Sequence, residues 1–97
     1  MPDHPRPTRT RAEIAAMDAA RTRLDNARVT VRHHAWQAGP PDGADIPGYP
    51  DMISHALKLL SEREPERLPR LYQSLANGRV DDVVNGLYAY HQQIESN

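Results

Sequence analysis

The most constraining feature of this 97-residue sequence is a segment without glycine or proline that covers residues 11–37. Thr10 and Glu13 stand at its start with the spacing of a capping box, in which each side chain bonds the other residue's backbone amide. Alanine is frequent within the segment, and Gly39-Pro40-Pro41 follows it. These signals predict one helix over residues 11–37, about 40 Å long. Such a helix is long for so small a chain, which leaves part of it to be covered by something other than its nearest neighbours.

One face of this predicted helix carries apolar residues at spacings of three and four, with large side chains at one heptad position and small ones at the other. Arginines flank this seam at positions where charged side chains commonly select the partner. We therefore expect the seam to form an interface. A histidine within it makes acid-sensitive assembly a further hypothesis. The predicted interface consists of Met17, Ala20, Arg21, Leu24, Ala27, Arg28, Val31 and His34.

Charge and apolar residues are divided unevenly along the chain. Residues 1–37 hold seven basic and four acidic side chains, a net charge of +3, whereas residues 38–97 hold five and nine, a net charge of −4. Eighteen large apolar residues lie between 46 and 94, and only six lie between 2 and 45. The core is therefore expected in the C-terminal part, with the N-terminal helix packed against it or against another chain.

The C-terminal part is predicted to contain three short helices, over residues 51–63, 66–77 and 80–95, after a loop over 38–50 with four prolines and three glycines. The fold class is all-α, a small bundle of these helices with one long N-terminal amphipathic helix. Residues 1–9, rich in proline and arginine, are expected to be a mobile arm, and residues 10–97 a single helical domain. Gly86, inside the last predicted helix, suggests close backbone packing at that point.

Residue patterns for catalysis and metal binding are absent from the sequence. It has no cysteine, no His-x-x-x-His or Glu-x-x-His pair on a helix, no nucleophile motif and no glycine-rich phosphate loop. We therefore assign no catalytic, cofactor-binding or metal-binding residue, and expect no cofactor. An enzyme is therefore the less favoured hypothesis for this chain. No apolar run is long enough for a membrane span, and the N-terminus lacks the apolar core of a secretory signal, so we expect a cytoplasmic protein.

Two functions remain compatible with these patterns. The favoured one is a helical protein–protein interaction or accessory protein, which assembles through the long helix as a homodimer or as a subunit of a larger complex. The alternative is a DNA-binding transcriptional regulator that uses the basic arm and first helix. Residues 75–80 resemble the turn of a helix-turn-helix motif, but Asp81 and Asp82 begin the helix that would meet the phosphates and would be repelled by them.

Overall fold

The computed structural model describes residues 10–96, which form four α-helices and two short 3-10 turns. The helices are α1 (Arg11–Ala38), α2 (Tyr49–Arg63), α3 (Leu68–Ala76) and α4 (Val80–Ser96), and the turns are Pro41–Gly43 and Pro65–Arg67. The described residues contain no strand, so the predicted all-α fold with one long N-terminal helix is confirmed. The predicted arm, residues 1–9, lies outside the described residues.

Helix α1 begins at the predicted capping box. The Thr10 amide donates to the Glu13 carboxylate at 2.8 Å, and the Glu13 amide donates to the Thr10 hydroxyl at 3.1 Å. Both bonds satisfy amides that a helix terminus otherwise leaves without a partner. At the other end, Gly39 has a φ of 76°, a conformation that favours glycine, and its amide caps the carbonyl of Ala35.

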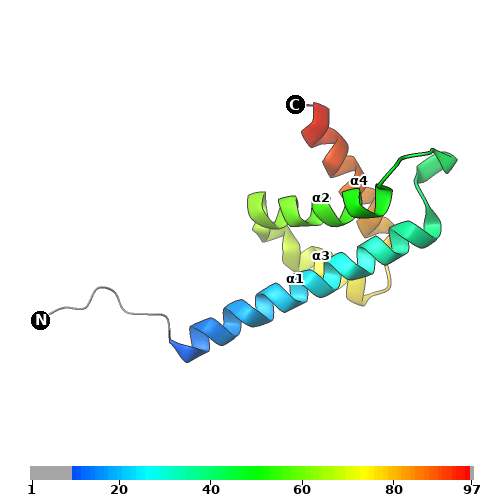
Figure 1. Cartoon of the computed structure of the whole chain (residues 1–97). Helices are drawn as coiled ribbons and strands as arrows, with labels where there is room; N and C mark the ends of the chain where they lie inside the picture. The colour runs from blue at the N-terminus through cyan, green and yellow to red at the C-terminus, as the bar shows by residue number, and fades with distance from the viewer. Residues whose placement is uncertain (1–9, 97) are drawn as a thin grey trace, which may run out of the picture.

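Helix α2 runs antiparallel to the second half of α1. This direction follows from two contacts, because Arg32 meets Asp51 whereas Arg28, one turn earlier in α1, meets Ser54, later in α2. Helix α4 packs against both helices (Figure 1), and its buried side chains complete the core. The core therefore draws on both parts of the chain. Its largest fully buried side chains are Ile53, Leu57, Leu60, Leu87 and Val31.

The first half of α1 extends beyond the other helices (Figure 1). Every residue from 11 to 23 is exposed to solvent, whereas Ala27, Val31 and Ala35 are buried. We call residues 11–23 the overhang; at 1.5 Å per residue it is about 20 Å long. The described protein is thus a helical body from which one continuous helix projects.

Helix α3 is strongly amphipathic but lies on the margin of the body. None of its residues is fully buried, and its apolar side chains Leu68, Leu71, Tyr72 and Leu75 are half-buried. Gly86 of α4 lies beside a groove next to this helix, and a Cβ atom added there would meet no atom within 4 Å. The predicted close backbone packing at Gly86 is therefore wrong, because the neighbouring helices do not approach that point.

Candidate functional site

The apolar face that α1 buries in the body continues along the overhang without a cover from the described residues. Ile14 lies three seven-residue repeats before Ala35, and Met17 lies two such repeats before Val31. The four residues therefore lie on nearly the same face of the helix. Val31 is fully buried, whereas Ile14 remains 49% exposed and Met17 46% exposed. The same stripe thus changes from core to surface along a single helix.

An open groove of about 400 Å³ lies where the overhang leaves the body. Its α1 side is formed by Ala20, Arg21, Arg23 and Leu24, and its other side by Ser61, Leu68 and Tyr72. The Arg23 guanidinium lies 4.3 Å from the centroid of the Tyr72 ring, within the range of a cation–π contact. Burial raises the pKa of Tyr72, and the positive charge of Arg23 opposes that shift.

The predicted interface residues fall into two groups in the structure. Ala27 and Val31 are buried in the chain's own core, the Arg28 Nε donates to the carbonyl and hydroxyl oxygens of Ser54 at 3.2 and 3.1 Å, and His34 pairs with Asp81 at the start of α4. The second half of the predicted seam therefore serves the fold of the chain itself.

The other group is available for a partner. Met17, Ala20 and Arg21 are exposed, and Leu24 is half-buried at the edge of the groove. The exposed positions lie together on one face of the overhang, next to the groove. Contact between these residues and another chain stays a prediction.

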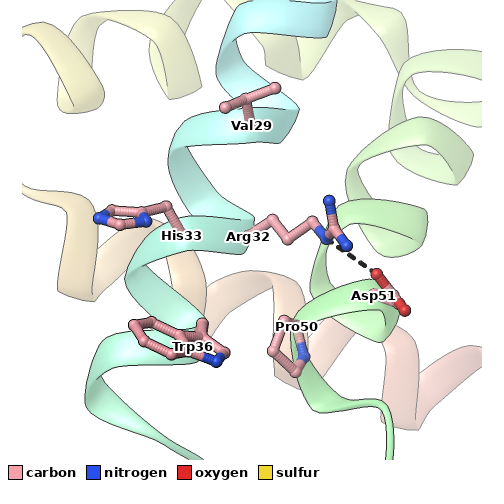
Figure 2. Close-up of a pocket in the computed structure, with 6 residues that line it drawn as sticks. All are labelled: Val29, Arg32, His33, Trp36, Pro50 and Asp51. Carbon is pink, nitrogen blue, oxygen red and sulfur yellow. Dashed lines mark ion pairs between the residues drawn. The ribbon is translucent and has the colours of Figure 1, made fainter.

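A second surface, on the other side of α1, was not predicted from the sequence. We call it the Trp36 surface; Figure 2 shows its residues around an open groove of about 440 Å³. Trp36 is 72% exposed and Val29 is 65% exposed, although both are large apolar residues. Val29, His33 and Trp36 have the spacing i, i+4, i+7, which places residues on one helix face and could have indicated this surface. The Trp36 surface consists of Val29, Arg32, His33, Trp36, Pro50 and Asp51.

Two contacts within the chain join side chains of the Trp36 surface. The Arg32 Nε lies 2.9 Å from a carboxylate oxygen of Asp51 and closes one side of the groove, as the dashed line in Figure 2 marks. The ring centroids of His33 and Trp36 are 6.3 Å apart with an interplanar angle of 23°, which is a stacked arrangement. This surface therefore presents an aromatic face beside a proline, with one ion pair at its rim.

The described residues include no cluster of three or more side chains suited to hold a metal ion. None of the described helices is long and apolar enough to cross a membrane. A scan against protein-family models and searches of the curated proteins and of the solved structures found no significant match to this chain. The stripe on the overhang and the Trp36 surface are therefore taken as candidate functional sites among the described residues.

Proposed function

We propose that this chain is a small helical interaction protein that assembles through the overhang of α1, in the simplest case as a homodimer and otherwise as a subunit of a larger complex. The observation that carries the proposal is the continuous α1 stripe, which is buried at Val31 and about half exposed at Met17 and Ile14. A helix that projects from its body exposes apolar side chains to water, and a second helix is the simplest partner that covers them.

Charge on the overhang favours an antiparallel pair of two copies. When the two Met17 residues meet at the two-fold axis, residues whose numbers sum to 34 face each other. Glu13 then faces Arg21 of the other copy, and Ile14 faces Ala20. A parallel pair would place Glu13 against Glu13 and Arg21 against Arg21, and like charges at such positions are unfavourable. The alanine at position 20 also lets the two helices approach closely.

The expected stability of this homodimer is low. Full burial of a large apolar side chain contributes about 1.5–3 kcal/mol, and Ile14, Met17 and Leu24 are already partly covered. Half of that from each of six side chains gives a total of about 4–9 kcal/mol, against an association cost of about 4–15 kcal/mol. We therefore expect the stripe alone to hold a dimer with a Kd no tighter than roughly a few tenths of a millimolar, and a tighter complex where further contacts or a partner that also fills the groove add to it.

Light scattering at increasing protein concentration tests the proposal. The matched variants are Ala20→Asp, on the stripe, and Ala19→Asp, on the opposite side of the overhang; both alanines are exposed. We expect the wild type and Ala19→Asp to dimerise alike and Ala20→Asp to stay monomeric, because only position 20 faces the other copy. Equal dimerisation of both variants would contradict an interface on the stripe, and a monomeric wild type at millimolar concentration would contradict the homodimer.

A further inference from the structure

The Trp36 surface presents one aromatic ring to solvent beside an apolar groove. Trp36 and Val29 are the most exposed large apolar residues among those described, and Pro50 of α2 forms the facing wall. Figure 2 shows the Trp36 ring next to Pro50, with Asp51 at the rim of the groove. Grooves lined by aromatic residues bind proline-rich segments, because a polyproline II helix is already ordered and has no internal hydrogen bonds to break.

Such a segment lies within this chain, before α1. Residues 1–9 contain Pro2, Pro5 and Pro7, and also the basic residues Arg6 and Arg9. Arginine is attracted to the face of an indole ring. One carboxylate oxygen of Asp51 already pairs with Arg32, and because the Asp51 side chain is 76% exposed, its other oxygen can accept from one of these arginines at the rim. The composition of the segment therefore matches both the apolar and the acidic parts of the Trp36 surface.

The length of the segment shows which copy it can reach. Thr10 and Trp36 are 26 positions apart along α1, which is about 39 Å. Nine residues in a polyproline II helix span about 28 Å. Residues 1–9 thus fall short of Trp36 in their own chain.

In the antiparallel pair the distance is shorter. Thr10 of one copy lies beside Leu24 of the other, and from there Trp36 is about 18 Å further along the helix. Passing to the opposite side of a helix about 10 Å wide lengthens that path to about 24 Å. This path is within the reach of nine residues.

We propose that residues 1–9 of each copy bind the Trp36 surface of the other copy, with Pro2, which lies about 25 Å from Thr10 along a polyproline II helix, on the Trp36 ring and an arginine at Asp51. The inference rests on the proposed homodimer, to which it adds a second pair of contacts. Each exchanged segment covers the most exposed apolar side chain of the described residues, and the two contacts together tighten a dimer that the stripe alone holds weakly.

Trp36 is the only tryptophan in the sequence, so its fluorescence in the full chain reports this contact directly. The experiment follows the emission maximum and the molecular mass together as protein concentration rises. We expect the emission of the wild type to move to shorter wavelength over the range in which the mass doubles. A variant with Pro2, Pro5 and Pro7 changed to alanine should still dimerise, at higher concentration, but its Trp36 emission should not move.

The remaining outcomes show whether the exchange of residues 1–9 or the homodimer itself is wrong. Dimerisation without any movement of the emission, or equal movement in the proline variant, would overturn the exchange and leave the proposed homodimer intact. A shorter-wavelength emission in the monomeric Ala20→Asp variant would show that the segment reaches Trp36 of its own chain, which would also overturn the exchange. A wild type that stays monomeric would overturn the homodimer and the exchange with it.

Discussion

The sharpest test of the structure compares two substitutions on the same face of α1, Val31→Ala and Met17→Ala. Val31 is fully buried, whereas Met17 is 46% exposed on the overhang. Val31→Ala removes two methyl groups, each worth about 0.8 kcal/mol, and leaves a cavity. The free energy of unfolding should therefore fall by about 2–3 kcal/mol. Met17→Ala should lower it by less than about 1 kcal/mol, because alanine also favours the helix.

Urea unfolding followed by circular dichroism measures both values, at a protein concentration low enough to keep the chain monomeric. With a slope of about 1–3 kcal/mol per molar urea, Val31→Ala should lower the midpoint by about 0.7–3 M and leave the slope unchanged. A domain of this size is stable by about 5–15 kcal/mol, so the variant should still fold. Equal shifts for the two variants would contradict this prediction, because they would mean that Met17 is buried by its own chain.

Three further predictions concern Gly86 of α4, Glu13 at the start of α1 and Tyr49 in the core. Gly86→Ala should raise the free energy of unfolding by about 0.5–1 kcal/mol, measured by urea unfolding, because the added Cβ meets nothing and alanine favours the helix. Hydrogen bonds from Thr10 lower the pKa of Glu13. The capping box therefore stabilises α1 fully at pH values above the ordinary pKa of glutamate, and this stabilisation is lost as the pH falls through the lowered pKa. The Glu13 amide resonance should then report fraying of the overhang in acid, and a Glu13→Gln variant should show no such titration. Burial raises the pKa of Tyr49. The neutral phenol therefore stabilises the fold fully at pH values below the ordinary pKa of tyrosine, and this stabilisation is lost as the pH rises through the raised pKa. Tyr49→Phe should remove this part of the alkaline destabilisation, as followed by thermal unfolding between pH 9 and 11 (roughly the range around the unperturbed tyrosine value).

The helices could be predicted because their signals are local. The capping box at Thr10 and Glu13 and the glycine and prolines from Gly39 onward predict a helix over residues 11–37, and the structure has Arg11–Ala38. The short helices agree in the same way, except that the residues after Pro65 form a 3-10 turn before α3. Caps and helix-breaking residues act within a few positions, so the sequence alone reports them.

The sequence could not predict which part of the apolar stripe the chain itself buries, because periodicity identifies an apolar face but not the chain that covers it. Val31 and Met17 occupy the same heptad position, yet the first lies in the core and the second on the overhang. Arg28 was expected to flank an interface, but it bonds Ser54, which is 26 residues away in sequence. That contact depends on the antiparallel packing of α1 and α2, which no local pattern specifies.

The sequence contains a signal for the Trp36 surface. Val29, His33 and Trp36 share the i, i+4, i+7 spacing, but the apolar stripe on the other side of the helix is longer and more regular. A helix can carry two such faces, and only the structure shows that this one lies away from the core and beside Pro50.

Cysteine cross-linking shows whether two overhangs pair through the α1 stripe. The sequence has no cysteine, so Met17→Cys and Ala19→Cys each introduce a single thiol, one on the stripe and one on the opposite side of the overhang. A disulfide forms only when the two Cα atoms come within about 7 Å. We expect Met17→Cys to form a disulfide-linked dimer rapidly and Ala19→Cys to form little. We also expect cross-linking in a mixture of Ile14→Cys with Ala20→Cys, as an antiparallel pair requires. Equal and slow cross-linking at positions 17 and 19 would show that the overhangs do not pair through the stripe.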